Sequence, residues 1–412
     1  MKIAILGAGF TGLTAALKLA QDGHEVTIFE KESIVGGLAS GFKIKGWNWY
    51  LDKTYHHLFT NDSSAISLAS TVNQKLITKR PETAVLVKNQ MSAFDSPITL
   101  IKFSILPIID RLRVGVCTFY LKYITSPKYI NHHYALIWLT KFMGKNATEM
   151  IWNPLFEGKF GAQKHIISLT WFWARIKKRT PSLIYPEGGF QTFAEKVQSE
   201  AEKHRVKFNF NSEISNISSL NTKFDKIIVT LPTQVFNKVA KLPIAYQKKL
   251  NSIPHLSALN LILVLKKPFF IKETYWLNIT DQSFPFLVLA EHTNFMEKKY
   301  YNNQHILYIG CYLPENHPYL KMSSKKLLKL FDPYLKKINS SYSSSIITSY
   351  LFTHSNAQPI VAPDYKEKIP DFKTPLRNVY LANLDMVYPW DRGVNYAIKL
   401  GEDIAKIISK EK

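Results

Sequence analysis

The stretch ILGAGFTGLTAALKLAQDGHEVTIFEKESIVGGLAS, residues 5–40, decides the fold class of this chain. An apolar run at residues 2–6 leads into it and predicts a buried parallel strand. Gly7, Gly9 and Gly12 follow with the spacing G-x-G-x-x-G. The first glycine permits a tight turn, the second lets the backbone approach a pyrophosphate, and the third lets a helix pack closely on the strand. The order of strand, glycine turn and helix therefore predicts a Rossmann-like α/β domain.

The residues after the glycine turn specify the ligand. A helix is expected over residues 12–22, with its N-terminal amides facing the phosphates. The next run, HEVTIFE, predicts a second strand and ends at Glu30, 18 residues after Gly12. A carboxylate at this position accepts hydrogen bonds from a ribose diol and repels a 2′-phosphate. The pattern therefore predicts an adenine dinucleotide that has no 2′-phosphate.

A second glycine pair follows Glu30 after a short loop, in the segment GGLAS at residues 36–40. The pattern E-x(5)-G-G-x-A after such a turn resembles the superfamily of flavin amine oxidases, protoporphyrinogen oxidases and phytoene desaturases. In that superfamily the double glycine brings the main chain close to FAD. The resemblance implies FAD as the cofactor, and the implied contacts in this part of the chain are Gly7, Gly9, Phe10, Thr11, Gly12, Glu30, Lys31, Gly36, Gly37, Leu38 and Ala39.

Three later segments resemble the same superfamily, in the same order. YPEGGFQTFAEKV at residues 185–197 is similar to its glycine-rich turn leading into a helix. RVKFNFNSEISNI at residues 205–217 predicts two short strands, and the superfamily's backbone contact to adenine corresponds to Ile214 on the second. FDKIIVTLPTQVF at residues 224–236 predicts an apolar strand closed by Pro232.

The C-terminus predicts a strand at residues 378–381, then a loop and a helix. Ala382-Asn383 stands where the superfamily has Gly-Asp, Gly-Glu or Gly-Asn near the ribityl chain, and Ala382 departs from that pattern. The following helix would aim its positive N-terminal end at the flavin ring, where it stabilises the anionic reduced ring. The implied contacts here are Asn383, Arg392, Gly393, Val394 and Asn395.

These motifs predict a discontinuous FAD-binding domain of the GR2 type, formed by residues 1–74, 184–240 and 365–412. The two inserts would form the substrate domain. Residues 75–183 are rich in aromatic and aliphatic residues with helical spacing and predict its helical part. Residues 241–364 contain several strand-like runs and predict an antiparallel sheet that forms one wall of the substrate cavity.

The first candidate for catalysis is LDKTYHHLFTND at residues 51–62. Tyr55, His56 and His57 follow the double glycine, and the segment is similar to the histidine-containing loop of UDP-galactopyranose mutase. A histidine here can act as a general acid or base near neutral pH, and His57 is the stronger candidate. The alternative is a histidine that only hydrogen-bonds the flavin or packs beside it. Tyr55 is assigned to the substrate.

The second candidate is YPWDRG at residues 388–393. Arg392 is expected either to contact FAD phosphate, to stabilise negative charge on the flavin, or to form a structural ion pair with Asp391. Tyr388 and Trp390 are expected to stack on the substrate or to close the cavity.

Two further segments leave alternatives open. In IWNPLFEGKFG at residues 151–161, Glu157 and Lys159 either reach the cavity or belong to a buried structural turn. The aromatic run WFW at residues 171–173, beside ARIKKR, suits a membrane interface or a core helix with a solvated edge.

The chain has 412 residues and a formal net charge of +22. No nucleic-acid-binding motif appears and only eight of the 53 basic residues are arginines, so nucleic acid is not expected as a partner. A lysine excess of this kind is explained by genome composition and solvated faces; peripheral contact with anionic lipid is the alternative, and it is favoured over nucleic acid. Two distant cysteines give neither metal spacing nor a disulfide framework, and a cytoplasmic location at the inner face of the membrane is expected.

The best membrane candidate is residues 96–124, SPITLIKFSILPIIDRLRVGVCTFYLKYI. Lys102, Asp110 and two arginines interrupt it, and Pro107 breaks it. It therefore lacks the about 20 apolar residues of a transmembrane helix, although it is able to lie in or against a bilayer. The basic amphipathic stretch at residues 323–338 suits either a core-facing surface helix or membrane contact.

The resemblance implies an FAD-dependent oxidoreductase that transfers hydride from an apolar or lipid-linked small molecule to flavin N5. Two alternatives stay open: a redox-neutral flavoenzyme of the UDP-galactopyranose mutase type, and a flavin-free prenyl-binding module of the type of Rab GDP-dissociation inhibitors. No metal site is expected, and the substrate and oligomeric state stay open.

Overall fold

The computed structural model describes residues 1–411 and is built around a parallel five-stranded sheet. Its strands come from both ends and the middle of the chain, which therefore meet in one layer. Leu6, Phe29, Val229 and Leu381 lie at the same, carboxyl edge of the sheet. In sheet order the strands are β10 (Lys207–Asn209), β2 (Glu25–Phe29), β1 (Lys2–Leu6), β11 (Lys226–Val229) and β17 (Val379–Leu381).

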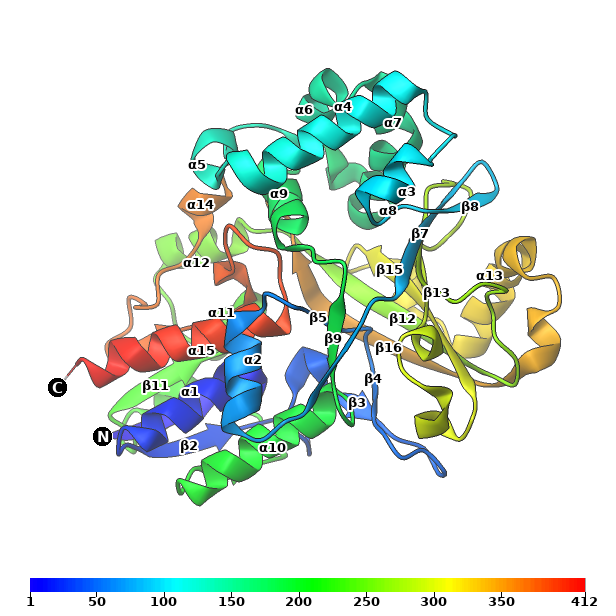
Figure 1. The fold of residues 1–412 in the computed structure, drawn as a ribbon. Helices are drawn as coiled ribbons and strands as arrows, with labels where there is room; N and C mark the ends of the chain where they lie inside the picture. Colours follow the sequence, from blue (N-terminus) through cyan, green and yellow to red (C-terminus); the bar gives the residue numbers. More distant parts are fainter. Residues whose placement is uncertain (412) are drawn as a thin grey trace.

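Helices from distant parts of the sequence cover this sheet (Figure 1). The first begins at Phe10, two residues before the predicted start, because the helical turn already includes the middle of the glycine motif. Gly12 packs so closely that a Cβ on it would lie 2.0 Å from the carbonyl oxygen of Gly7. The helices of this part are α1 (Phe10–Gln21), α2 (Ser63–Thr71), α10 (Phe190–Lys203), α11 (Thr233–Val239), α12 (Ile244–Asn251), α14 (Tyr365–Lys368) and α15 (Val394–Ser409).

The second large layer is a seven-stranded sheet, at the right of Figure 1. Its interior positions are almost continuously apolar, and α13 (Ser324–Ile338) packs Leu327, Phe331 and Leu335 against it. The basic helix predicted at residues 323–338 is therefore a core-facing surface helix. In sheet order the strands are β16 (Ile346–Pro359), β12 (His255–Leu265), β15 (His305–Leu313), β14 (Val288–Glu291), β13 (Thr274–Ile279), β7 (Glu82–Val87) and β8 (Gln90–Ala93).

This sheet differs from the prediction in two ways. It is mixed, because β13 and β7 pair in parallel while the other neighbours pair antiparallel. Moreover, β7, β8 and β6 (Leu76–Lys79) lie within residues 75–183, where helices were expected. β6 joins β5 (Leu58–Phe59) and β9 (Leu183–Pro186) in a small sheet that links the two large layers, and β3 (Gly41–Phe42) pairs with β4 (Leu51–Asp52).

A helical layer lies above the two sheets in Figure 1. It has its own apolar core, in which Trp171, Phe172 and Trp173 are buried, so the aromatic run belongs to the core and not to a membrane interface. Glu157 pairs with Lys164 at 2.6 Å. The helices are α3 (Pro97–Ile101), α4 (Ile108–Phe119), α5 (Pro127–Ile130), α6 (Ala135–Phe142), α7 (Lys145–Ala147), α8 (Asn153–Phe160) and α9 (Leu169–Lys178), with π-helical turns at Tyr120–Ile124 and Thr148–Trp152.

Candidate active site

The two glycine segments of the N-terminal region contact each other at the carboxyl edge of the parallel sheet. Gly9 and Gly36 form a parallel bridge, and the Gly36 N–H donates to the Ala8 carbonyl at 2.9 Å. A Cβ on Gly37 would lie 3.1 Å from the Gly9 Cα, whereas a Cβ on Gly9 would meet only the Gly37 Cα, at 3.9 Å. The backbone at Gly9 is therefore tightly supported on one side and open on the other, as a phosphate cradle requires.

Glu30 lies beside this cradle, directly after β2. Its Oε2 accepts a hydrogen bond from the Ala8 N–H at 2.7 Å, and its Oε1 accepts one from the Glu32 N–H at 3.0 Å. The carboxylate is thus fixed next to the first glycine turn, where a ribose diol would lie. Lys31 pairs with Glu32 at 3.6 Å and is largely exposed, so its assignment to the cofactor stays a prediction.

The segment predicted to contact adenine has a different local structure. β10 ends at Asn209, and residues 210–216 form a loop instead of the expected second strand. The loop nevertheless lies beside Glu30, because the Ser212 N–H donates to the Glu30 carbonyl at 2.9 Å. Ile214 is half-buried there, packed with the core that includes Phe29, and its adenine contact stays a prediction.

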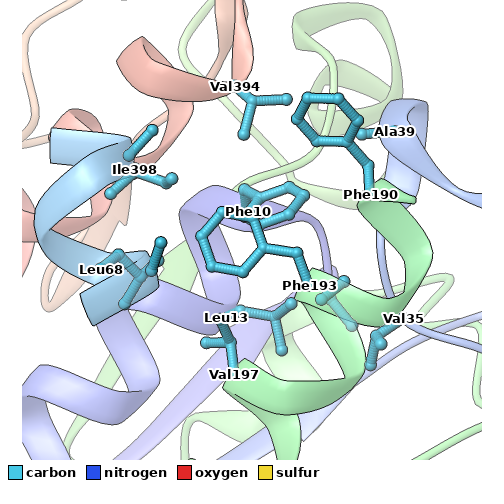
Figure 2. Close-up of a cluster of buried hydrophobic side chains, with 14 of the residues drawn as sticks. Phe10, Leu13, Val35, Ala39, Leu68, Phe190, Phe193, Val197, Val394 and Ile398 are labelled. Carbon is cyan, nitrogen blue, oxygen red and sulfur yellow. The ribbon is translucent and has the colours of Figure 1, made fainter. Parts of the chain in front are cut away.

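Several predicted cofactor residues use their side chains for packing. Phe10, Ala39 and Val394 belong to the same buried apolar cluster and lie close together, with Phe190 beside them, in Figure 2. The ring of Phe10 lies 5.1 Å from that of Phe193. These positions therefore join helices α1, α10 and α15, and they can offer a ligand only backbone groups. Leu38, in contrast, is exposed.

The side chains of the two C-terminal asparagines predicted to contact FAD form hydrogen bonds within the protein. The Asn383 side chain donates to the Thr233 hydroxyl at 2.9 Å and accepts from the Asp385 N–H at 3.2 Å. The Asn395 Oδ1 accepts from the Ala65 N–H of α2 at 3.1 Å. Gly393, between them in the sequence, is exposed, and a Cβ there would meet only Tyr396, at 3.9 Å. The open group of this segment is thus the backbone at the N-terminus of α15.

The histidine-containing loop is half-buried, with Tyr55, His56 and His57 each partly accessible. His57 Nδ1 is 3.4 Å from the Tyr275 hydroxyl, whereas His56 Nδ1 has no partner among residues 1–411. Burial lowers the pKa of both imidazoles to about 3, and the charge of Arg392 adds to the effect at His56, as Arg179 does at His57. Both rings are therefore neutral near pH 7, so neither holds the proton that a general acid needs there; their catalytic roles stay predictions.

Tyr55, assigned to the substrate, packs on the seven-stranded sheet. Its ring meets that of Trp276 edge-on at 4.8 Å, and a Cβ on Gly310 would lie 2.7 Å from its hydroxyl. Trp390 stacks between Trp173, at 5.2 Å, and Tyr396, at 5.9 Å. The contacts of Trp390 join the C-terminal loop to α9 of the helical layer and to α15.

Tyr388 lies on the same loop as Trp390. It is half-buried, and its ring lies 5.8 Å from that of Tyr365. The substrate roles of Tyr55, Tyr388 and Trp390 stay predictions.

Arg392 points to the substrate domain. Its Nε donates to Gln358 Oε1 at 2.9 Å and its Nη2 to the Tyr312 hydroxyl. The expected ion pair with Asp391 does not form, because Asp391 pairs with Arg175 of α9 at 2.5 Å. The guanidinium therefore lies against β15 and β16, which argues against the contact with FAD phosphate.

Lys159 completes a group of cations around Asp391. It is buried, and its ammonium lies over the rings of Tyr312, at 4.6 Å, and Trp171, at 5.1 Å. Burial, followed by the charge of Arg175, lowers its pKa well below the ordinary value. Burial opposes the ionisation of Asp391, but the charges of Lys159 and the two arginines outweigh it and lower the pKa to about 2. The sequence had offered Lys159 only as an alternative and had missed Arg175 and Tyr312, which no motif marks.

The comparisons with known proteins agree with this geometry. The model of the family described as flavin containing amine oxidoreductase matches residues 10–408. The chain belongs to this family. It is therefore an oxidoreductase of a flavin-containing family, as the glycine motifs predicted.

The curated relatives match only a short part of the chain. Over 54 residues the chain is 52% identical to a 4,4′-diapophytoene desaturase (4,4′-diaponeurosporene-forming) of Staphylococcus aureus strain COL, which is 13% of this chain and 11% of that protein. The chain thus spans about a ninth of the length of the curated relatives it matches.

Solved structures share the whole fold at low identity. A reduced UDP-galactopyranose mutase has a TM-score of 0.78 at 15% identity, covering 100% of this chain and 96% of that one. A candidate protoporphyrinogen oxidase from Exiguobacterium sp. 255-15 has a TM-score of 0.77 at 14% identity, covering 100% and 99%. Cyclohexylamine oxidase from Brevibacterium oxydans IH-35A has a TM-score of 0.71 at 12% identity, covering 100% and 99%. These likenesses establish the fold.

At the start of the histidine-containing segment 51–62, the protein buries a carboxyl group that the sequence did not single out, that of Asp52. Asp52 Oδ2 accepts from the Tyr185 hydroxyl at 2.8 Å, and Oδ1 accepts from the Phe190 N–H at 3.3 Å. The Tyr308 hydroxyl donates to the Asp52 carbonyl at 2.6 Å. Burial raises the pKa of Asp52 to about 8, although the two hydrogen bonds to its side chain oppose the shift. The group is thus largely protonated near pH 7.

Asp52 is expected to make stability depend on pH. Its pKa is 3.8 in the unfolded chain and about 8 in the folded protein, so its contribution is full below pH 4 and is lost as pH rises toward 8. The free energy of unfolding should fall by about 1.4 kcal/mol per pH unit in this window relative to Asp52→Asn, which does not titrate. Urea denaturation of both proteins at pH 5, 6, 7 and 8 measures the difference. A difference that stays constant with pH contradicts the assignment.

Proposed function

We propose that this protein binds FAD and uses it to oxidise an apolar or lipid-linked small molecule that carries a negatively charged group. The observation that supports the proposal best has two parts. The backbones at Gly9 and Gly37 are in contact beside Glu30, and the N-terminus of α15 packs close to them through Val394 and Phe10 (Figure 2). The second part is a wall of aromatic rings and cations that includes Tyr312 and Lys159. The first part of this arrangement suits a long dinucleotide, and the second suits its substrate.

The residues present fit FAD. The N-terminus of α1 and the backbone at Gly9 would hold the pyrophosphate, and Glu30 would accept hydrogen bonds from the adenosine ribose. The exposed backbone at Gly37 and Gly393 leaves room for a ligand where a side chain would fill the space. Bound FAD supplies the acceptor for two electrons, and the protein supplies orientation, electrostatics and the exclusion of water.

The chain's own side chains define how a substrate would be held. Aromatic rings of Tyr55, Trp276 and Tyr312 offer apolar surface, which favours a substrate with an apolar body. The neutral imidazoles of His56 and His57 can donate or accept one hydrogen bond each but carry no charge near pH 7. Removal of a hydride equivalent from an apolar substrate requires no charged acid at this position.

The cations favour an anionic group on that substrate. Lys159 forms no hydrogen bond or ion pair with any other described residue, and Arg175 and Arg392 lie close enough to lower its pKa. Asp391 is the only carboxylate that counters them in the interactions recorded for this group. An ammonium without a hydrogen-bond or ion-pair partner on a largely buried side chain is costly to the fold, and such groups are retained at sites where a ligand supplies the missing charge.

Replacing Lys159 with methionine is expected to make the protein more stable and less active. Methionine has a similar volume and needs no counter-ion, so the free energy of unfolding should rise by about 1 kcal/mol or more. Lys164→Met is the matched control, because Lys164 has an ion pair with Glu157 and its loss brings no gain. Urea denaturation measures stability, and the rate of flavin bleaching by an anionic substrate measures activity. A Lys159 variant that is less stable, or equally active, contradicts the role.

The substrate class is tested by anaerobic bleaching of the bound flavin. Polyprenyl phosphates, porphyrinogens, neutral polyprenyl lipids, amines and sugar nucleotides form the panel. Bleaching by apolar compounds with an anionic group, and not by their neutral counterparts, is the expected result. Bleaching by amines alone would overturn the proposed substrate class, and turnover of UDP-galactopyranose without net bleaching would favour the redox-neutral alternative.

A further inference from the structure

The helix α4 is oriented with its apolar side outward. Ile109, Leu112 and Val116, spaced by three and four residues, are 68%, 60% and 69% exposed. Asp110 and Val114, on the opposite side, are buried. An amphipathic helix on a protein surface normally has the reverse orientation, so this outer side is available to a partner that is itself apolar.

Polar contacts fix α4 in this orientation. Asp110 Oδ2 accepts from Asn146 Nδ2 at 2.9 Å. Arg113 donates from Nε to the Phe142 carbonyl at 3.1 Å and from Nη2 to the Lys141 carbonyl at 3.0 Å. Rotation of the helix to bury its apolar side would break these bonds and leave a carboxylate uncompensated.

The apolar surface continues beyond α4. Of the 21 large apolar side chains that are exposed among residues 1–411, 14 lie between residues 98 and 142. These side chains lie on neighbouring elements, because α4 packs against α3, α6 and the π-helical turn 120–124, and both this turn and α5 pack against α9. We call the surface of α3, α4, the π-helical turn, α5 and α6 the docking face. Tyr123 and Tyr129 on it combine an aromatic ring with a hydroxyl, which suits the boundary between lipid and water.

The charge of the docking face selects its partner. Residues 97–142 contain six lysines and arginines, and Asp110, their single acid, is buried. Lys102, Arg113, Lys128 and Lys141 are exposed. Two copies of this face would repel each other, whereas an anionic lipid surface satisfies both the apolar side chains and the cations.

We propose that the docking face binds the surface of a bilayer that contains anionic lipids. Among residues 1–411 no helix has the length and apolar character needed to cross a membrane. The short helices therefore insert side chains at the level of the head groups, with the protein on one side of the bilayer.

The docking face adjoins the candidate active site. Lys122 of the π-helical turn donates to the Arg179 carbonyl at 2.7 Å, and Lys177 of α9 donates to the Lys122 carbonyl at 2.7 Å. The same helix α9 carries Arg175, which pairs with Asp391. A lipid-linked substrate would thus meet the active site next to the bilayer; this last step rests on the proposed function, whereas docking itself does not.

Co-sedimentation of the full chain with vesicles tests the docking face. We expect binding to vesicles of phosphatidylcholine with phosphatidylglycerol, weaker binding to phosphatidylcholine alone, and a loss of binding at high salt. The double variant Leu112→Glu/Val116→Glu should reduce binding about tenfold or more, since it removes two apolar anchors and adds two like charges to the lipid. Circular dichroism should show unchanged melting, because both side chains are exposed.

The double variant Ile244→Glu/Ile271→Glu is the matched control, because both isoleucines are exposed outside the docking face. Retained binding by this variant supports the proposal. Wild-type chain that stays in the supernatant with anionic vesicles, or a control that loses binding equally, overturns it. The proposal is also overturned if the wild-type chain does not bind vesicles and is a dimer in light scattering that Leu112→Glu/Val116→Glu dissociates and the control variant does not. That result would favour a contact between two copies of the chain. Binding is measured as protein in the pellet, so a colourless preparation that pellets contradicts the proposed function and not the docking face.

Discussion

Replacing Gly401 with alanine is expected to lower the free energy of unfolding by about 3 kcal/mol and to leave the purified chain without bound flavin. Gly401 lies where α15 crosses α1. A Cβ on it would be 2.5 Å from the Thr11 carbonyl oxygen, 2.8 Å from the Thr14 Cβ and 3.0 Å from the Ala15 backbone nitrogen. Two of these atoms are backbone and cannot move aside, so the helices must separate. Their N-termini, at which we propose that FAD binds, would then be displaced.

Gly115→Ala is the matched control for this experiment. Gly115 also lies within a helix, but a Cβ there would meet only Leu100 Cδ2, at 3.6 Å, which is an ordinary contact. Alanine should stabilise that helix slightly, by up to about 1 kcal/mol. Urea denaturation and flavin content of both variants give the comparison. Equal stability of the two variants contradicts the close packing of α15 on α1.

Replacing Glu30 with arginine is expected to weaken FAD binding about 100-fold or more. The wild-type carboxylate would accept hydrogen bonds from the ribose diol, and charge-assisted bonds of this kind are worth about 1.5–3 kcal/mol each. An arginine side chain accepts no hydrogen bonds from the ribose. The variant also loses the two hydrogen bonds that the Ala8 and Glu32 N–H groups donate to the Glu30 carboxylate, which hold the first glycine turn in place.

Glu32→Arg separates this specific effect from the change in charge. Glu32 is two residues away, and its side chain is 64% exposed and bonded only to Lys31. Titration of flavin-free protein with FAD, followed by fluorescence, measures both variants. Equal FAD affinity for the Glu30 and Glu32 variants contradicts the assignment of Glu30 to the ribose.

The parts of the fold that the sequence predicted are those with a local signal. Gly7, Gly9 and Gly12 have to stand at fixed spacing in a turn, so the motif located β1 and α1 to within two residues. One of the strand-like runs predicted within residues 241–364, HILYIGCYL at residues 305–313, is β15, because an apolar run of this length indicates burial by itself.

The parts that it missed depend on contacts between distant residues. β7 forms a hairpin with the adjacent β8, and this local signal in its apolar run was overlooked. Its other partner, β13, lies almost two hundred residues later, and nothing in the sequence of β7 identifies that partner. Helical spacing predicted helices within residues 75–183, of which α4 is one, but spacing cannot show which side of a helix faces the protein. The ion-pair partner of Asp391 is Arg175, 216 residues earlier. The predicted ion pair between Asp391 and the neighbouring Arg392 was wrong, because the Arg392 guanidinium donates its hydrogen bonds to side chains of β15 and β16.

The most direct test of the central claim, that both ends of the chain form one FAD site, is the cofactor content of the purified protein. The account predicts a yellow protein that releases FAD, one molecule per chain, on denaturation, or that takes up FAD stoichiometrically when it is supplied. A colourless chain that is folded and does not bind added FAD would contradict it, and would favour a flavin-free binding module with the same fold.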